Sequence, residues 1–351
     1  MSAPAPIRRT RRVTRVGPVS VRVSRRALGA GIAIASLIAV LVVVGSMIGD
    51  YPMSFGQTVQ SLFGIGDDPL ARYFVQEQRL PRVAATVLVG AALGMSGAIF
   101  QNLSGNPLGS PDVIGFTVGA SSGAILQIII FDSGPATTAL GAIVGGFGTA
   151  ALVYVLTWRG GIAGFRLVLV GIGISAILHA INTLLIERAS LSAAQNAQQW
   201  LAGSFHATTW AESVLIAVAL AILGPSALAL SRPLGAMMLG DDTALGLGVR
   251  LEQVRLALVL VGVALVSLAT AAAGPIAFVA LAAPQLARRL TGTRGVGIAG
   301  AALMGAALVL ASDIIAQRIF APKEIAVGVV TGSLGGVYLI WILAREWRRG
   351  A

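Results

Sequence analysis

The sequence predicts an all-α, polytopic integral membrane protein with about ten transmembrane helices and both termini in the cytoplasm. Three observations support this fold class. Hydrophobic residues make up 56% of the 351 residues and charged residues only 11%, whereas a water-soluble domain is usually about 25% charged. The apolar residues gather in runs, most of them long enough to cross a bilayer. The basic residues gather between those runs and at the ends of the chain, as membrane topology signals do.

The chain opens with a basic segment, residues 1–26, which contains eight arginines and no acidic residue. We predict that it is a cytoplasmic tail. The apolar run that follows, 27–49, is too long for the core of a signal peptide, so we expect a retained helix. The other nine predicted spans are 83–100, 113–131, 136–158, 167–186, 211–230, 256–273, 275–287, 296–316 and 326–344. Of these, 275–287 has the weakest signal, because it is short and starts at Gly274-Pro275.

The ten spans define one transmembrane domain over residues 27–345, with a cytoplasmic loop at 231–255 and a cytoplasmic tail at 346–351. Positive charge tests this topology, because loops on the cytoplasmic side carry an excess of lysine and arginine. Six of the 25 basic residues fall in outer segments and the remaining 19 in inner ones. The outer six are Arg72, Arg79, Arg82, Arg188, Arg318 and Lys323. Arg79 and Arg82 therefore oppose the general bias, which suggests that they have a specific role.

Several kinds of chemistry lack their residues in this sequence. The chain has no cysteine, so it has no disulfide framework and no thiolate metal site. Lys323 is the only lysine, and a phosphate-binding P-loop requires Gly-Lys-Ser/Thr. The histidines at 179 and 206 have no adjacent carboxylate, which argues against a zinc site. We expect a conduit without catalytic residues, cofactor or metal, whose net charge of +11 reflects topology and not nucleic-acid binding.

Glycines are placed to bring helices together. Pairs spaced as Gly-x-x-x-Gly lie in apolar runs at positions 90 and 94, 119 and 123, 141 and 145, and 328 and 332. Small residues at this spacing let helices approach closely in lipid. We expect them to pack within one bundle, with a dimer face as the alternative.

Three stretches resemble one family, the permeases of ABC importers for iron–siderophores, haem and vitamin B12. Residues 79–120 carry Arg-Leu-Pro-Arg, a glycine-rich helix, Asn-Pro-Leu and Pro-Asp in the family's order. Residues 239–249 read LGDDTALGLGV, and residues 273–292 read AGPIAFVALAAPQLARRLTG. Many relatives carry His where this chain has Gln285. The stretches APQLARRLTG and SLGGVYLIWIL are most similar to ferric-enterobactin-type permeases.

The resemblance implies a type II importer in the inner or plasma membrane, in contact with lipid and with no nucleic-acid partner. Two ten-helix permeases would lie side by side with two cytoplasmic ATPase subunits, which bind ATP and Mg, and with an extracytoplasmic siderophore-binding protein. Enterobactin-type permeases usually work as two different chains, so the resemblance favours a heterodimer over a homodimer. The implied substrate is a ferric siderophore of the catecholate type, with haem or cobalamin as the alternative.

The resemblance assigns Arg79 and Arg82 to docking, because the corresponding arginines of the family pair with glutamates on the binding protein. One exposed pair contributes only about 0–1 kcal/mol, but several pairs set the docking register and the association rate. Snorkelling to lipid headgroups is the alternative. Relatives often have a further arginine where this chain has Gln317. Arg318 follows it, rotated by about 100° on a helix, and is a third docking candidate.

The loop 231–255 is the longest inner segment after the N-terminal tail. In the family this loop holds the coupling helix, which sits in a groove of the ATPase. The residues that the resemblance assigns to coupling are Leu239, Gly240, Asp241, Asp242 and Ala244. We expect Asp241 to be the N-cap of a short helix and Asp242 to be favoured by the helix dipole. An ordinary capped loop helix is the alternative.

Polar residues within the apolar runs are candidates for the transport pathway. Ser175, His179 and Asn182 fall on one helical face at i, i+4 and i+7, and in the family this fifth helix lines the central pathway. Interhelical packing is the alternative for them. Asp313 is the only carboxylate well inside a run, and we expect either a pore or gate residue or a buried helix–helix hydrogen bond.

Two functions from other classes predict different sequences. An ATP-independent secondary transporter would need intramembrane ion-pair relays, for which only Asp313 is available. A purely structural membrane scaffold would leave the outward Arg-Leu-Pro-Arg without a purpose. We therefore predict the transmembrane permease subunit of an importer whose ATP hydrolysis is carried out by a separate chain.

Overall fold

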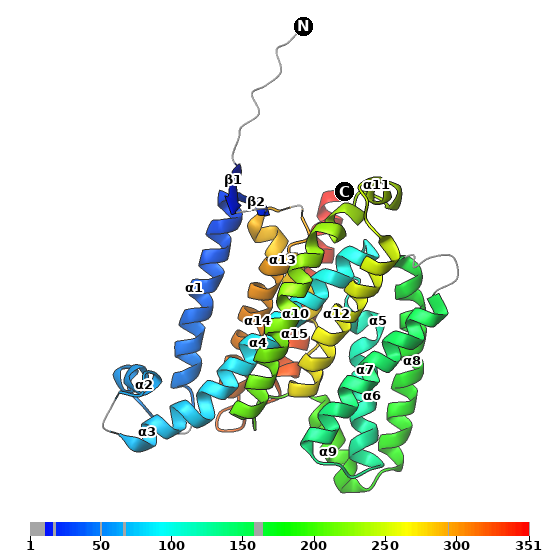
Figure 1. Ribbon diagram of the computed structural model, residues 1–351. Helices are drawn as coiled ribbons and strands as arrows, with labels where there is room; N and C mark the ends of the chain where they lie inside the picture. Colours follow the sequence, from blue (N-terminus) through cyan, green and yellow to red (C-terminus); the bar gives the residue numbers. More distant parts are fainter. Residues whose placement is uncertain are drawn as a thin grey trace.

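The structure, a computed structural model, describes residues 11–16, 19–49, 51–65, 68–157, 164–293 and 295–350. Figure 1 shows a bundle of helices that run side by side. The short helix α11 (Asp241–Gly246), the N-terminal end of α1 (Arg25–Met47) and the C-terminal end of α15 (Val327–Gly350) lie at one end of the bundle. The opposite end carries α2 (Phe55–Leu62), α3 (Pro69–Tyr73) and α9 (Leu191–Leu201). The arginines at 8, 9, 159 and 294, which entered the charge distribution, lie outside the described residues.

Each of the ten predicted spans corresponds to a helix. They are α1 (Arg25–Met47), α4 (Leu80–Ser104), α6 (Phe116–Ile129), α7 (Pro135–Thr157), α8 (Gly164–Arg188), α10 (Trp210–Met237), α12 (Leu251–Ala273), α13 (Val279–Thr291), α14 (Ile298–Arg318) and α15 (Val327–Gly350). Within the described residues, seven helices are long and apolar enough to cross a membrane. The apolar stretches of α6 and α15 are shorter, and α13 has only 13 residues. The approximate count of ten and the multi-pass membrane fold are confirmed.

Several short elements were not predicted from the sequence. The predicted N-terminal tail contains an antiparallel pair of strands, β1 (Arg11–Val16) and β2 (Val19–Ser24). The signal for β2 was present, because valines alternate with polar residues at 19, 21 and 23, and this period of two is typical of strands. A π-helix, η1 (Phe74–Arg79), and a helical turn, α5 (Pro111–Ile114), precede α4 and α6.

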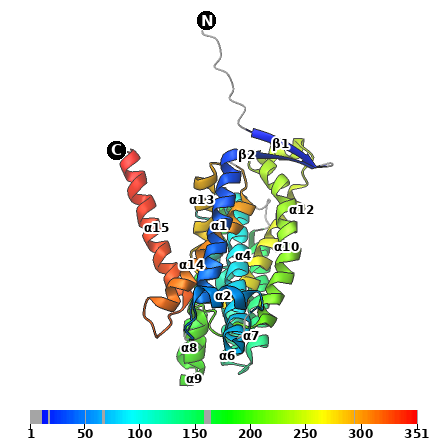
Figure 2. The same ribbon diagram turned by 90° about the vertical axis from the view of Figure 1, so that its left-hand side faces the viewer.

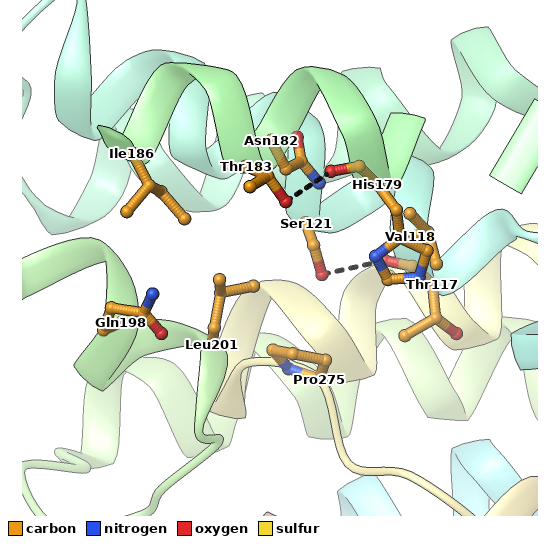
Figure 3. A pocket seen from close by; sticks show the side chains of 10 residues that line it. All are labelled: Thr117, Val118, Ser121, His179, Asn182, Thr183, Ile186, Gln198, Leu201 and Pro275. Atoms are coloured by element: carbon orange, nitrogen blue, oxygen red, sulfur yellow. Dashed lines mark hydrogen bonds between the residues drawn. The ribbon is translucent and has the colours of Figure 1, made fainter. Parts of the chain in front are cut away.

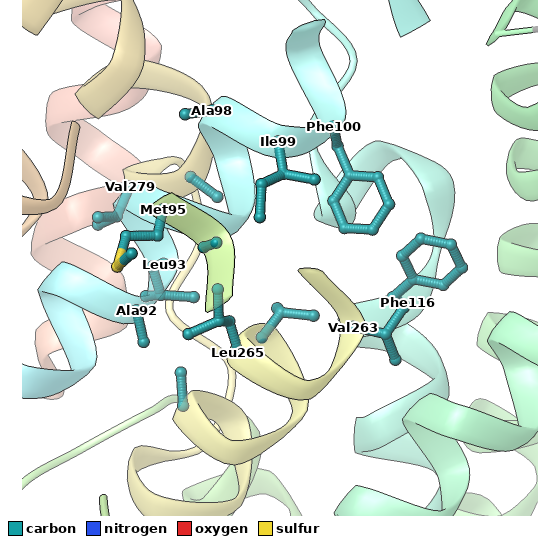
Figure 4. Packing of buried hydrophobic residues seen from close by; sticks show 14 of the residues in the cluster. Ala92, Leu93, Met95, Ala98, Ile99, Phe100, Phe116, Val263, Leu265 and Val279 are labelled. Atoms are coloured by element: carbon teal, nitrogen blue, oxygen red, sulfur yellow. The ribbon is translucent and has the colours of Figure 1, made fainter. Parts of the chain in front are cut away.

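Helix α4 lies at the centre of the bundle, in contact with α10, α12, α13 and α14. Its apolar side chains contribute to a large buried cluster, part of which Figure 4 shows, and there Phe100 lies 5.1 Å from Phe116 of α6, centroid to centroid. On its other side, a Cβ atom added at Gly90 or Gly94 would overlap the backbone of α14, and one added at Gly97 would overlap that of Ala280. Helices therefore touch backbone to backbone along α4.

Helices α6 and α7 also contact each other through glycines. Gly119 and Gly123 of α6 face the backbone of Gly141 and Gly145 of α7, with no space for a Cβ atom on either side. The prediction that these glycine pairs pack within one bundle is confirmed for α4, α6 and α7. On α15, Gly328 packs against Ala202, whereas a Cβ atom added at Gly332 would have no neighbour within 4 Å.

Several helices are poorly covered by the rest of the described chain, among them α8 and α15. Helix α8 exposes large apolar side chains such as Ile177 and Leu184, and α15 exposes Val337 and Ile340. Figure 2 shows α15 leaning away from the bundle toward its C-terminal end. Because such side chains are unfavourable in water, lipid or another protein must cover these faces.

Candidate functional site

An ion pair joins α4 to α14 at the end of the bundle opposite the chain termini. The guanidinium of Arg82 donates from Nε to Oδ2 of Asp313 at 3.1 Å and from Nη2 to Oδ1 at 2.9 Å. The amide of Gln317 donates to the same carboxylate at 2.7 Å. Asp313 is 1% exposed, so these bonds offset the cost of a buried charge. The buried helix–helix hydrogen bond, one of the two alternatives for Asp313, is present, and its role as a pore or gate residue stays a prediction.

The same arginine connects two loops. Nη1 of Arg82 lies 2.9 Å from Oε2 of Glu324, in the loop between α14 and α15. That oxygen is also 3.2 Å from Nδ1 of His206, in the loop between α9 and α10. Burial alone would raise the pKa of Glu324, but the charge and hydrogen bond of Arg82, with a hydrogen bond from His206, hold that pKa below its ordinary value. Four segments thus meet in one charged cluster at the outer end.

Arg79 has a different environment from the one expected. Its side chain is 7% exposed and donates to the carbonyl oxygens of Ser46, Met47 and Tyr51 at 3.1, 3.2 and 2.7 Å. It therefore satisfies carbonyls at the C-terminal end of α1, which have no partner within the helix. The expectation of an exposed Arg79 is wrong, because the turn after α1 encloses it. Docking by Arg79 and Arg82 stays a prediction. Arg318 is exposed at the same end.

The coupling candidates lie at the end of the bundle that carries the chain termini. Gly240 is the N-cap of α11, with φ 106° and ψ 151°, a conformation that favours glycine. The prediction of Asp241 as N-cap is wrong by one residue. Asp241 instead pairs with Arg255 at 2.7 Å, and Asp242 is exposed. Ala244 is buried, so it packs within the loop and does not face outward.

The apolar surface of this loop is made by leucines. Leu239, Leu245 and Leu247 are 68%, 56% and 66% exposed. Leu239 was among the predicted residues, whereas the other two were not. The leucines that recur in LGDDTALGLGV could have predicted this apolar surface, but the prediction rested on the glycines and aspartates.

A cavity of about 360 Å³ lies between α6, α8, α9 and the start of the chain segment after α12. Figure 3 shows the side chains that line it. They are Thr117, Val118, Ser121, His179, Asn182, Thr183, Ile186, Gln198, Leu201 and Pro275. The wall therefore contains no carboxylate, lysine or arginine, and it combines hydroxyl, amide and imidazole groups with apolar side chains. Asn182 is 6% exposed, and its buried Oδ1 has no hydrogen-bond partner.

Two of the three predicted pathway residues of α8 meet in this cavity. His179 and Asn182 line it, but Ser175 does not and instead lies against Gly115. Thr117 and Ser121 of α6 were missed, because hydroxyl groups in an apolar run give no distinct pattern. Gln285, which stands where many relatives have His, donates to the carbonyl of Pro107 at 2.9 Å. Among the described residues, no group of three His, Cys, Asp or Glu side chains is arranged to hold a metal ion.

Comparison with known proteins agrees with this arrangement. Residues 37–345 match the FecCD transport family. The chain belongs to this family. It is 46% identical to the ferric enterobactin transport system permease protein FepG of Escherichia coli (strain K12) over 330 residues, which cover 94% of this chain and 99% of FepG. It is also 32% identical over 185 residues to FepD, another permease of the same Escherichia coli system, covering 52% of this chain and 55% of FepD.

A solved ABC transporter structure has a similar fold. An inward-facing metal-chelate type ABC transporter superposes on this chain with a TM-score of 0.81 at 27% identity, covering 91% of this chain and 99% of the other. The chain is thus a multi-pass permease of the ABC importer type. The family membership expected from the three sequence stretches is confirmed.

Proposed function

We propose that this chain is the transmembrane permease subunit of an ATP-driven importer that moves a ferric siderophore of the catecholate type into the cytoplasm. The observation that carries the proposal is the 46% identity to the ferric enterobactin permease FepG along nearly the whole of both chains. Family membership alone would leave haem or cobalamin open. The single transmembrane domain would span residues 27–345, with cytoplasmic segments 1–26 and 346–351.

Uptake in cells tests this substrate. Escherichia coli cells that lack FepG but keep the other subunits would receive this chain, and its assembly with FepD would be checked by co-purification. In assembled complexes we expect uptake of radioactive iron supplied as ferric enterobactin, and none of iron supplied as a hydroxamate chelate. Assembled complexes that import cobalamin or haem, but not ferric enterobactin, would overturn the proposal.

A second permease chain is proposed as the cover for the exposed faces of α8 and α15. The similarity to both FepG and FepD supports a pair of different chains, so we favour a heterodimer. In that pair, the cavity beside Asn182 would open toward the pathway between the two chains. Its uncharged hydroxyl and amide groups suit a wall that a large ligand passes without binding tightly.

The α11 loop is proposed to dock a separate ATPase subunit, which would hold the ATP and Mg. The exposed leucines 239, 245 and 247 offer an apolar contact, and buried Ala244 shapes the loop. Leu245→Glu should abolish co-purification of the ATPase, because it places a charge in an apolar interface. Leu191→Glu, a similarly exposed leucine on α9 at the opposite end, is the matched control. Equal co-purification of both variants would remove α11 from the interface.

The outer end is proposed to dock the extracytoplasmic binding protein. The charge of Arg318 is exposed there, and Arg82 holds the loop that carries Glu324. Arg318→Glu should slow docking, since like charges across an interface are unfavourable, and Arg318→Lys should preserve it. Docking rates that are the same for both variants and insensitive to salt would exclude this residue.

A further inference from the structure

The segment between α1 and α4 has an apolar surface that the proposed function does not use. Residues 51–65 contain no charged residue. Phe55, Phe63 and Ile65 are 63%, 75% and 66% exposed, while Thr58 and Ser61 of the same helix are 0% and 4% exposed. A helix on a water-soluble protein has the opposite pattern, with its apolar side inward and its polar side outward.

Helix α2 has three distinct faces. At about 100° per residue, Phe55, Val59, Leu62 and Phe63 fall on one side. Gln60 belongs to an exposed polar side that also includes Gln57. Thr58 and Ser61 form the third side, which packs on the protein. An apolar face beside a polar face lets a helix lie in the plane of a membrane surface.

The position of α2 in the fold agrees with this orientation. It follows the end of α1 that lies opposite the chain termini, and Figure 1 shows α2 and α3 projecting sideways from the bundle beyond α1. Only 6% of the apolar part of α1 is buried. With the second permease chain proposed on α8 and α15, lipid would cover α1 along most of its surface. The apolar face of α2 continues this lipid-facing surface at the level where α1 ends. Leu70 and Tyr73 of α3 are exposed beside it.

Among the described residues, the contacts that hold this segment lie on the side that faces the bundle. Arg79 binds the carbonyls at the turn after α1, as described above. Nε2 of Gln76 donates to the carbonyl of Ser61 at 3.0 Å. The hydroxyl of Tyr51 lies 3.2 Å from Oδ2 of Asp68, and its ring stacks on Phe74 at 5.1 Å. These bonds fix the position of α2 against the bundle and leave the aromatic side free.

We propose that α2 and its flanking turns form an interfacial anchor, seated at the boundary between headgroups and acyl chains of the outer leaflet, and that Arg79 is the positioning residue that sets its depth. Phospholipid is the occupant that fits, because the face is aromatic and aliphatic and adjoins a lipid-covered helix. A protein partner would also find no charge for complementarity in residues 51–65, which contain no charged residue.

Fluorescence quenching in membranes tests the anchor. The natural chain has no cysteine, so a single environment-sensitive fluorophore can be attached to Phe63→Cys or, as the matched control three residues away, to Gln60→Cys. The full-length chain with its partner subunits would be placed in phosphatidylcholine vesicles that contain brominated lipid. We expect lipid quenching at position 63 to exceed that at position 60 by at least about threefold, because an interfacial helix buries its apolar face about 5–10 Å. Iodide in the water should quench in the reverse order.

Two outcomes would overturn the anchor. Equal quenching of both positions by brominated lipid would mean that α2 does not lie in the leaflet. Quenching of position 63 by iodide that disappears when an extracytoplasmic binding protein is added would assign this face to that protein. In the Arg79→Met background we expect the contrast between the two positions to fall, while a label at Leu37→Cys, an exposed position on α1, keeps its quenching by lipid. An unchanged contrast would remove Arg79 from the positioning role.

Discussion

Helices α4 and α8 have the same mean hydropathy of 2.0 over their apolar windows, yet 78% of the window that contains α4 is buried and only 17% of that of α8. The side chains explain the difference. The buried face of α4 is rich in glycine, alanine and serine, which let α14 and α13 approach its backbone. Helix α8 carries Ile172, Ile177, Ile181 and Leu184 on its exposed sides. Hydropathy thus indicates that a helix belongs in a membrane, while small residues decide which helix lies at the centre of the bundle.

The largest expected effect comes from filling a glycine contact of α4. Gly94→Leu would force its side chain into the backbone of Ala301, so we expect the variant to lose its folded, monodisperse state in detergent. Gly173→Leu on α8 is the matched change, since a Cβ atom there has nothing within 4 Å, and it should leave the melting temperature nearly unchanged. Size-exclusion chromatography and thermal melting would compare the two. Similar losses in both variants would contradict the difference in packing.

The next effect concerns the buried charge between α4 and α14. Asp313→Ala leaves Arg82, which is 13% exposed, without its main partner, and breaking a buried pair in this way costs about 3–5 kcal/mol. The double variant Arg82→Met with Asp313→Leu should recover much of that loss, because no charge remains unpaired. The pair of Asp241 and Arg255 gives the control, because Asp241 is 52% exposed, and Asp241→Ala should cost only about 0–1 kcal/mol. Reversible melting of the natural chain, Arg82→Met, Asp313→Leu and the double variant measures the coupling. Additive losses at 82 and 313 would contradict it.

The two sides of α8 should differ in contact with water. We expect His179→Cys and Asn182→Cys to react several-fold faster with a water-soluble thiol reagent than Ile177→Cys and Ile181→Cys in at least one nucleotide state. Val89→Cys, which is fully buried in α4, should stay unreactive. Labelling rates in the assembled importer would be measured with and without ATP. If the cysteines at 179 and 182 do not react in any nucleotide state, these positions lie in packing contacts and not beside water.

The smallest expected effect is the pH dependence of the outer cluster. Because the pKa of Glu324 is lower in the folded chain than its ordinary value, the unfolded chain binds the proton more readily. The ionised carboxylate of Glu324 therefore stabilises the folded chain above the unfolded pKa of about 4.3. This contribution is lost as the pH falls through the folded pKa. Glu324→Gln should narrow the gap between melting temperatures at pH about 7 and about 4. An unchanged gap would show that this carboxylate does not contribute.

The sequence by itself determined the solvent, the approximate helix count and the family. Low charge and long apolar runs leave only a bilayer as the environment for most of the chain, and the distribution of arginine predicts the topology. The glycine pairs predicted close packing because the spacing of four residues places them on one helical face. The motifs in residues 79–120, 239–249 and 273–292 predicted the family because the three occur together in one chain, whereas no single one would be specific.

The tertiary structure alone decided the partners of the charged and polar groups. Arg79 and Arg82 are three residues apart and lie at the same end of the bundle. Arg79 is nevertheless enclosed by the turn after α1, whereas Arg82 pairs with Asp313, which is 231 positions away. Ala244 and Leu245 are neighbours, yet one is buried and the other 56% exposed. Local patterns predict which face of a helix a side chain occupies. What that face contacts depends on segments distant in the sequence, and those contacts form only when the chain folds.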